Sequence, residues 1–178
     1  MLNNTTSIPP DFRHKVILND GRETSIRPIC YTDKYEILAL FNRLSPETRF
    51  LRYHYAKPGL SDVELDYFCN VDYHDTFGLV AEMQRGSNMD IVGVGRYNRL
   101  PCHNIAEIAF VVEDKEQGNG IGTKLMEILA DLASKRGIKT FVAELLNENT
   151  IMMDILRKHD PDLERDIDGS SHHITLHV

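Results

Sequence analysis

Residues 110–124 read FVVEDKEQGNGIGTK, and this stretch decides the fold. Apolar residues end a predicted strand, a short polar turn follows, and a glycine-rich loop opens directly into an amphipathic helix. Such a loop presents unpaired backbone amides and the positive end of a helix dipole, with no Cβ atoms to keep a phosphate away. We therefore expect it to bind an anion, most simply a pyrophosphate. The alternative is that the glycines only make a tight turn and let the helix pack close to the sheet.

Three phosphate-binding motifs compete for this loop, and their spacing separates them. A P-loop requires G-x-x-x-x-G-K-[ST], whereas the order after Gly122 is Thr-Lys. The dinucleotide fingerprint requires G-x-G-x-x-G, but the loop has G-x-G-x-G after a polar turn. Glu144 lies at about the right distance downstream to bind a ribose, which keeps this second interpretation open. The third motif, Q/R-x-x-G-x-G/A, is met by Gln117, Gly120 and Gly122.

Downstream of the loop, the segment that begins at Ile121 carries the clearest helical pattern in the chain. Its apolar residues fall on one stripe, its charged residues lie off it, and Gly137 can end it. A buried strand is predicted at Thr140–Leu146. Asn147 then caps a further helix, and His173–Val178 closes the chain as a last strand. A strand-helix-strand unit therefore lies at the centre of a mixed α+β arrangement.

Upstream, the pattern predicts strands first, then helices, then strands again. Asn19-Asp20-Gly21 is a hairpin signal between the first two strands. Thr32, Ser45-Pro46 and the capping box at Ser61-Asp62-Val63-Glu64 mark three helix starts. The predicted strands before the loop are His14–Leu18, Thr24–Ile29, Phe77–Met83, Ile91–Tyr97 and Ile105–Val112.

Composition bounds the class of protein. The chain has 178 residues, which suits one domain, and we expect residues 1–11 to be a flexible leader and 12–178 a single domain. A net charge of −7 disfavours sequence-independent nucleic-acid binding, which depends on basic residues, and suits a cationic substrate. No signal peptide and no long apolar run is found, so we expect a soluble, cytoplasmic protein with no membrane partner.

Cysteines and histidines give little sign of further chemistry. Three widely spaced cysteines make neither a disulfide framework nor a zinc site and suit a reducing compartment. Cys102 could in principle carry an acyl group, but an inert thiol is the expectation. The pair His172-His173 and the later His177 suit a terminal strand, and we predict no metal site.

The third motif and its surroundings resemble the GNAT superfamily of N-acetyltransferases. More narrowly, the chain is similar from about residue 27 to residue 158 to the catalytic domain of bacterial Pat-type protein lysine acetyltransferases. The segments that carry this likeness are Arg27-Pro28-Ile29, the run LSPETRFLR at 44–52, VGVGRY at 92–97 and AEIAF at 106–110. The resemblance implies a central mixed, mostly antiparallel sheet flanked by helices, with acetyl-CoA bound at the strand, glycine loop and helix.

The same resemblance implies a set of cofactor-binding residues. The loop amides would hold the pyrophosphate of acetyl-CoA, the edge of the preceding strand would pair with the pantetheine arm, and residues of the next helix would contact that arm. Gln117 stands where many relatives have arginine, which makes one phosphate contact neutral. The residues so assigned are Phe110, Val111, Val112, Gln117, Gly118, Asn119, Gly120, Ile121, Gly122, Thr123, Asn149 and Met152.

Glu107 is the candidate general base. It is the only charged residue in the strand 105–112, and alternation places it on one face with Ile105, Ala109 and Val111. An apolar setting there is expected to raise its pKa. A solvated glutamate on the strand is the alternative that the residues alone favour, and the resemblance, which implies the family's base at this position, reverses that preference.

The resemblance also exposes a missing group. Many superfamily members use a tyrosine to protonate the departing CoA thiolate, but Leu156 stands at that position here. The usual Gly-Phe after this helix is replaced by His159-Asp160-Pro161. The CoA thiol has a pKa of about 8.5, so its thiolate is a fair leaving group and water can supply the proton.

The sequence thus predicts an acetyl-CoA-dependent N-acetyltransferase. The implied acceptor is a protein lysine, for instance on an acyl-CoA synthetase, attacked directly in a ternary complex with Glu107 as base. Two alternatives stay open besides a nucleotide-binding oxidoreductase: an N-acetyltransferase for small amines, and a non-catalytic module that binds CoA or acyl-CoA and regulates a partner. The sequence makes no prediction of the oligomeric state.

Overall fold

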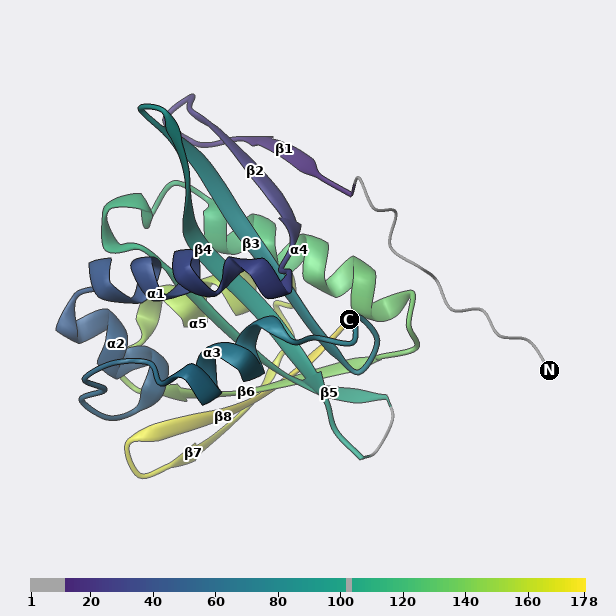
Figure 1. Cartoon of the computed structure of the whole chain (residues 1–178). Coiled ribbons are helices and arrows are strands. Elements are labelled where there is room, and N and C mark those ends of the chain that lie inside the picture. Colours follow the sequence, from purple (N-terminus) through teal and green to yellow (C-terminus); the bar gives the residue numbers. More distant parts are fainter. Residues whose placement is uncertain (1–11, 102–103) are drawn as a thin grey trace.

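The computed structural model describes residues 12–101 and 104–178. These residues build one eight-stranded sheet in the order β1-β2-β3-β4-β5-β6-β8-β7 (Figure 1). Its strands are β1 His14–Ile17, β2 Glu23–Pro28, β3 Thr76–Arg85, β4 Asn88–Arg99, β5 Ile105–Val112, β6 Thr140–Leu146, β7 Glu164–Asp168 and β8 Ser171–His177. Each neighbouring pair is antiparallel except β5 and β6, which are parallel. The expected mixed, mostly antiparallel sheet is confirmed.

Helices cover both faces of this sheet. One face carries α1 Lys34–Arg43, α2 Pro46–Tyr53 and α3 Asp62–Cys69, and the other carries α4 Ile121–Ser134 and α5 Thr150–His159. Two short 3-10 helices, η1 Tyr31–Asp33 and η2 Asp114–Glu116, precede α1 and follow β5. None of the helices in the described ranges is both long and apolar enough to cross a membrane.

The two faces have separate apolar cores. The larger core lies between the sheet and the pair α4 and α5, and it includes Leu125, Leu129 and Phe141, each fully buried. The smaller core lies under α1 and α3 and includes Phe41 and Ile91. Because alternate residues of a strand point to opposite faces, each central strand contributes to both cores. Side chains of β5 therefore divide between the two faces.

Several local signals act as the sequence predicts. The Ser45 hydroxyl accepts a hydrogen bond from the Thr48 amide and so caps α2, with proline at the first helical position. Ser61 and Glu64 form both halves of the capping box of α3. Gly21 has a φ of +84° in the β1–β2 turn, a conformation that favours glycine. These three elements are confirmed.

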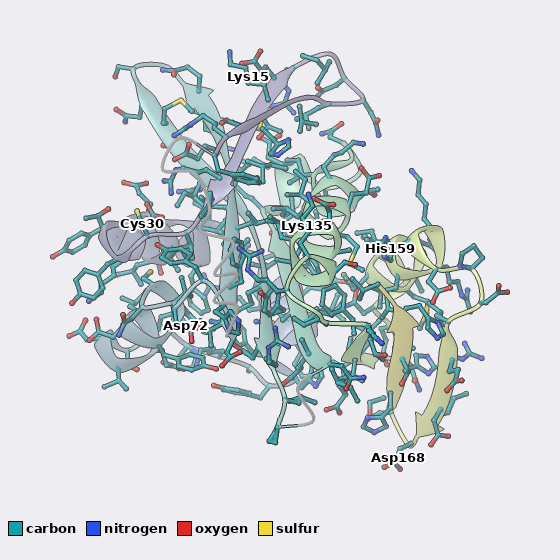
Figure 2. The ribbon with its side chains drawn as sticks, turned by 90° about the vertical axis from the view of Figure 1, so that its right-hand side faces the viewer. Lys15, Cys30, Asp72, Lys135, His159 and Asp168 are labelled. Carbon is teal, nitrogen blue, oxygen red and sulfur yellow. The ribbon has the colours of Figure 1, made fainter. Side chains whose placement is uncertain are left out.

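Other local predictions are wrong at specific residues. Thr32 does not cap α1, because η1 lies between them. Asp33 occupies the N-cap position of α1, and its side chain makes no capping hydrogen bond. The cap of α5 is Asn149 rather than Asn147, since the Asn149 side chain accepts the Met152 amide hydrogen bond. The last strand begins at Ser171 and pairs with an unpredicted strand, β7. Figure 2 shows this β7–β8 hairpin, with Asp168 at its tip.

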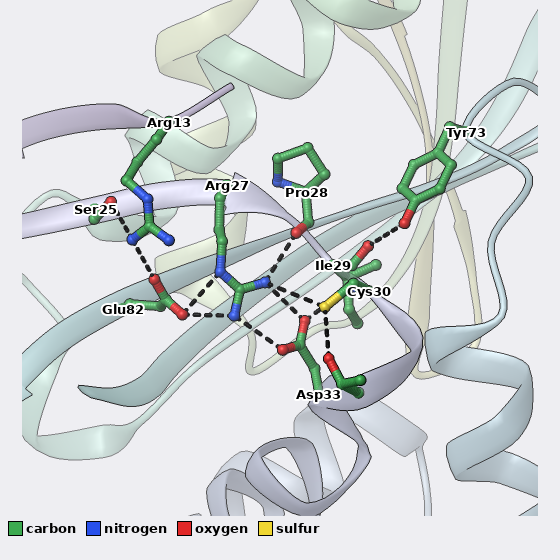
Figure 3. A network of polar contacts seen from close by, with 10 residues as sticks. Arg13, Ser25, Arg27, Pro28, Ile29, Cys30, Asp33, Tyr73 and Glu82 are labelled. Carbon is green, nitrogen blue, oxygen red and sulfur yellow. Dashed lines mark hydrogen bonds and ion pairs between the residues drawn. The ribbon is translucent and has the colours of Figure 1, made fainter. Parts of the chain in front are cut away.

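A buried polar network fixes the start of the α1 segment against the sheet (Figure 3). The Arg27 guanidinium on β2 donates to Asp33 Oδ2 at 2.8 Å and to Glu82 Oε1 on β3 at 2.8 Å. Arg13 donates to the second Glu82 oxygen at 2.7 Å. Burial opposes ionisation of Asp33, but its hydrogen bonds, chiefly from Arg27, outweigh this and hold its pKa below the usual value. The network thus sets where α1 begins over the sheet.

Candidate functional site

The sheet contains a cleft where two of its central strands part. β5 pairs with β6 only from Ile105–Thr140 to Glu107–Val142, and within the described chain no further pairing joins the two strands. The cleft has a volume of about 450 Å³, which lies within the range of small-molecule sites. It runs from the point of divergence to the N-terminus of α4. Every residue assigned above to the cofactor lines it: Phe110, Val111, Val112, Gln117, Gly118, Asn119, Gly120, Ile121, Gly122, Thr123, Asn149 and Met152.

The glycine loop has the conformation that an anion site needs. Gly118 and Gly120 have φ angles of +77° and +92°, which L side chains rarely adopt. In the described chain, the amide groups of residues 118–123 have no backbone acceptor. A Cβ on Gly122 would lie 2.7 Å from Ile155 Cδ1, so this glycine lets α4 pack on α5. The loop therefore serves both tight packing and amide presentation.

Two acidic side chains next to this loop are paired with arginines. Glu113 is buried and accepts hydrogen bonds from Arg43 and Arg85 at 3.0 and 2.9 Å. Glu116 accepts from Arg85 and Arg22 at 2.7 and 2.6 Å. Burial opposes ionisation of Glu116, but its bonds to these two arginines outweigh burial and lower its pKa. The charges of Glu113 and Glu116 are thus compensated by arginines, although Glu116 also lines the cleft beside the loop.

Asp114, the third acid of this turn, connects the loop to α2. It accepts hydrogen bonds from the hydroxyls of Ser45 at 2.6 Å and Thr48 at 2.7 Å. Burial raises its pKa, but these bonds outweigh burial, so the pKa of Asp114 lies below its usual value. Because Ser45 also caps α2, one contact couples the position of the loop to the start of that helix.

Hydrogen bonds of Gln117 and Asn19 hold the glycine loop in position. The Gln117 amide donates to the Val112 carbonyl at 3.0 Å and to the Thr48 hydroxyl at 3.3 Å, so its side chain is committed to the protein. Asn19, in the β1–β2 turn, donates through its side chain to the Gly118 carbonyl at 3.2 Å and through its backbone to the Asn119 carbonyl at 3.1 Å. Both residues therefore position the loop. The groups that remain to contact a phosphate here are the backbone amides.

The α5 side of the cleft is built by the helix start. Asn149 Oδ1 accepts from the Met152 amide at 3.2 Å, and both residues lie on the cleft wall. Met152 is half-buried and packs against the larger core, while Met153 is buried. Leu156 is fully buried in the same core and so lies out of reach of the cleft. A proton donor at the tyrosine position of the family is therefore absent from this helix.

Glu107 stands at the residue where β5 and β6 part. As alternation predicts, it lies on the face opposite to Ala106 and Ile108, which are buried in the larger core. The expected apolar enclosure is wrong, because Glu107 is exposed. It also lies outside the set of cleft-lining residues, although Ile108 and Ala109 beside it are within that set. Its carboxylate is open to a partner that approaches from the α2 and α3 side.

The structure adds side chains that the sequence does not single out. Arg52 and His54, from the end of α2, line the cleft, and His54 Nδ1 lies 3.9 Å from Glu144 Oε1 on β6. His54 has a φ of +63°, unusual for a residue other than glycine. Arg52 belongs to the run LSPETRFLR, so the signal was present, but helical periodicity does not tell which cavity a side chain enters.

Two candidates from the sequence remain, Cys102 and the histidines near the C-terminus. Cys102 lies outside the described residues. Within the described ranges, no group of three or more His, Cys, Asp or Glu side chains could hold a metal ion. His177 Nδ1 lies 3.3 Å from Asp160 Oδ2, at the end of the chain.

Comparison with known proteins identifies the family. Residues 37–159 match the family described as the acetyltransferase (GNAT) family. An acetyltransferase of Pseudomonas aeruginosa is 30% identical over 82% of this chain and 81% of its own length. The acetyltransferase Pat of Mycolicibacterium smegmatis is 33% identical over 79% of this chain, a match that spans only 42% of that longer protein.

A solved structure agrees in fold. The GNAT domain of PAT from S. lividans superposes with a TM-score of 0.85 at 26% identity, covering 97% of this chain and all of that domain. The two proteins therefore share one overall fold. With a family match over most of the chain and a curated relative of similar length, the protein belongs to the GNAT family of acetyltransferases, enzymes that use acetyl-CoA.

Proposed function

We propose that this acetyltransferase acetylates protein lysine side chains, with Glu107 as the general base. The observation that carries the proposal is the coincidence of two features at one place. The cleft leads from the free amides of the glycine loop to the point where β5 and β6 part, and Glu107, exposed just outside the cleft lining, is the last β5 residue that pairs with β6. The similarity to two Pat proteins supports a protein acceptor.

The geometry of the cleft supports the proposed cofactor-binding residues. The pyrophosphate of acetyl-CoA lies on the amides of residues 118–123, where the α4 dipole stabilises its charge. The pantetheine arm lies along Phe110–Val112, whose edge toward β6 is unpaired in the described chain. Asn149 and Met152 contact the arm from α5. This arrangement places the thioester near Ala109 and Val111, within reach of an amine at Glu107.

The chemistry requires a base because lysine is cationic at neutral pH. With a pKa of about 10.4, roughly one lysine in 2,500 is neutral at pH 7, which is equivalent to about 4.6 kcal/mol of barrier. Glu107 takes the proton directly or through water, and its exposure suits an acceptor as large as a protein. Backbone amides near Val111 polarise the thioester carbonyl, and water protonates the thiolate because Leu156 cannot.

The proposal extends to the domain bounds, the cellular compartment and the acceptor class. We propose that residues 12–178 form one acetyltransferase domain. Cys30 and Cys69 are free thiols, which suits the reducing cytoplasm. The acceptor class includes lysines of acyl-CoA synthetases, as in the Pat-type resemblance.

The test is Glu107→Gln, with Glu164→Gln on the exposed strand β7 as the matched control. Turnover of a lysine peptide by Glu107→Gln is expected to fall by about 10²- to 10⁴-fold at pH 7, with acetyl-CoA affinity measured by calorimetry unchanged. The loss should shrink above pH 9, where the lysine deprotonates unaided. Undiminished turnover of Glu107→Gln between pH 6 and 8 would overturn the base assignment.

Leu156 supports a second candidate, a module that binds acyl-CoA without transferring the acyl group. A leucine side chain cannot donate a proton, so the acid that the family resemblance implies at this position is missing. A mass-spectrometric screen of cell protein and small amines with acetyl-CoA separates the two. Binding of acetyl-CoA without any acetylated acceptor would favour the module, while acetylation confined to small amines would correct the acceptor class.

A further inference from the structure

A second cavity lies on the α1–α3 side of the sheet and opens next to the cleft. It has a volume of about 40 Å³, more than the 10–15 Å³ or so that one water needs. Arg52, Ala109 and Val111 line both the cavity and the cleft. The rest of its wall is apolar or aromatic apart from one further arginine, Arg96. The cavity thus brings two guanidinium groups to the border of the proposed acyl-transfer site.

Arg96 is a buried cation with incomplete hydrogen bonding. It lies on β4 opposite Ala109 and is only 6% exposed. Its Nη2 donates to Asn98 Oδ1 at 3.2 Å, but its buried Nε has no hydrogen-bond partner. The guanidinium carbon lies 4.7 Å from the centre of the Tyr67 ring and 5.1 Å from that of Phe68. Aromatic rings thus hold the group in place and leave a donor unused.

Arg52 is a second cation that has no carboxylate partner in the described chain. It is half-buried on α2, and its guanidinium carbon lies 5.1 Å from the centre of the Tyr53 ring. In the described chain, neither Arg52 nor Arg96 has a carboxylate within ion-pair distance. Burial lowers the pKa of Arg52, and the charges of Tyr53 and Glu107 partly oppose this effect. Burial also lowers the pKa of Arg96, and the charge of Arg52 adds to this effect.

This pair differs from three other half-buried arginines, although half-buried Arg49 also has no carboxylate within ion-pair distance in the described chain. Arg27, Arg43 and Arg85 each contact a carboxylate at 2.8 to 3.0 Å. Two neighbouring cations in an apolar cavity are unfavourable unless an anion compensates them. A carboxylate is small enough for the cavity and matches the planar donor groups of arginine. Their location in the fold therefore indicates a site completed by a bound acid.

We infer that Arg52 and Arg96 bind an acidic group that the acceptor carries close to its reactive amine. This inference rests on the proposed function and narrows its substrate class. The position favours the acceptor over the acyl group, because the next pair on this face of β4 and β5 after Arg96–Ala109 is Asn98–Glu107. An acid held here lies beside the proposed base. The acid is a side chain next to the lysine in a protein, or the carboxylate of a small amino acid.

The experiment compares matched acceptors with acetyl-CoA. One pair is a blocked peptide with a single lysine followed by glutamate, and the same peptide with glutamine. The other pair is a free ω-amino acid and its amide, which separates the protein source of the acid from the small-molecule source. Wild-type protein is expected to prefer the acidic member of at least one pair by about tenfold in kcat/KM, equivalent to about 1.4 kcal/mol.

The variants assign that preference to the arginines. In Arg52→Gln the ratio should fall to about one, and Arg96→Gln is the second test if it folds as judged by circular dichroism. Arg49→Gln is the control, because Arg49 lies on the same helix but lines neither the cavity nor the cleft. Direct binding of the acidic and neutral peptides to Glu107→Gln, measured by calorimetry with CoA present, should show the same preference without turnover.

Each failure has a distinct signature. Equal use of both members of both pairs by the wild type overturns the acid site, whatever the result for Glu107. A preference that survives in Arg52→Gln and in folded Arg96→Gln also overturns it. A preference for succinyl-CoA over acetyl-CoA that these variants abolish would place the acid on the acyl donor, against this inference. Retained turnover in Glu107→Gln with arginine-dependent binding would refute the base and leave the acid site intact.

Discussion

Replacing Gly120 by alanine tests whether the backbone of the glycine loop binds acetyl-CoA. Gly120 is the N-cap of α4 with a φ of +92°, and its carbonyl accepts the first helical hydrogen bond, from the Lys124 amide at 3.0 Å. A Cβ at this position would lie 3.5 Å from Asn19 Oδ1, an ordinary contact. The penalty is therefore conformational rather than steric.

The size of that penalty follows from the left-handed backbone. An L-residue costs about 1–2 kcal/mol there, which lowers Tm by roughly 2–8 °C in a chain of this length. If the loop rotates to relieve the strain, at least one amide loses its phosphate. A hydrogen bond to a charged group contributes about 1.5–3 kcal/mol, so acetyl-CoA affinity should fall about tenfold to a hundredfold.

Gly137 offers a matched control at the other end of the same helix. It has a φ of +80°, and a Cβ there would have no atom within 4 Å. Gly137→Ala should therefore lose similar stability, measured by thermal unfolding, while calorimetric titration shows wild-type acetyl-CoA affinity. If Gly120→Ala matches Gly137→Ala in both measurements, the loop amides do not bind the cofactor. If Gly120→Ala is as stable as wild type, the strain argument itself is refuted.

Two other perturbations separate structural from binding roles. Glu116→Gln removes a charge that Arg22 and Arg85 share, and should lower the free energy of unfolding in urea at pH 7 by about 3 kcal/mol. Because the folded pKa of Glu116 lies below 4.5, its stabilisation is present above that pH and lost as pH falls through the folded value. The variant should therefore converge with wild type in acid, and a constant difference down to pH 2.5 would contradict this. Asn149→Ala should lose about 0.5–2 kcal/mol of stability with the α5 cap, whereas Asn149→Ser keeps a capping oxygen and most of the stability. Reduced acetyl-CoA affinity in both variants would reflect the amide's contact with the cofactor, and wild-type affinity in Asn149→Ser would reduce Asn149 to a cap.

Local signals predict most of the elements because their causes lie within a few residues. The Asp-Gly turn, the Ser61 capping box and the loop into α4 each depend on side chains or φ angles inside one turn. Strand β7 could not be predicted from such local signals. Its residues are all exposed and show no alternation of apolar and polar side chains, so only the pairing with β8 makes it a strand. Asn147 and Asn149 are equally good caps by residue type, and the backbone after β6 decides between them.

The candidate site divides in the same way. Residues of the loop are predictable because backbone geometry and motif coincide there. Alternation along β5 gives the face of Glu107 correctly, but its exposure depends on how far α2 and α3 reach over the sheet. Arg52 on α2 and Arg96 on β4 lie far apart in the sequence but line the same cavity. No local sequence pattern predicts that the two side chains come together.

The parting of β5 and β6 has a mechanical consequence. The sheet consists of two blocks, β1 to β5 and β6-β8-β7, and the backbone joins them through the register pairs from Ile105–Thr140 to Glu107–Val142. With three residue pairs, this ladder is shorter than any other in the sheet. Acetyl-CoA bound along it would bridge the two blocks, so binding should raise the temperature at which the sheet unfolds.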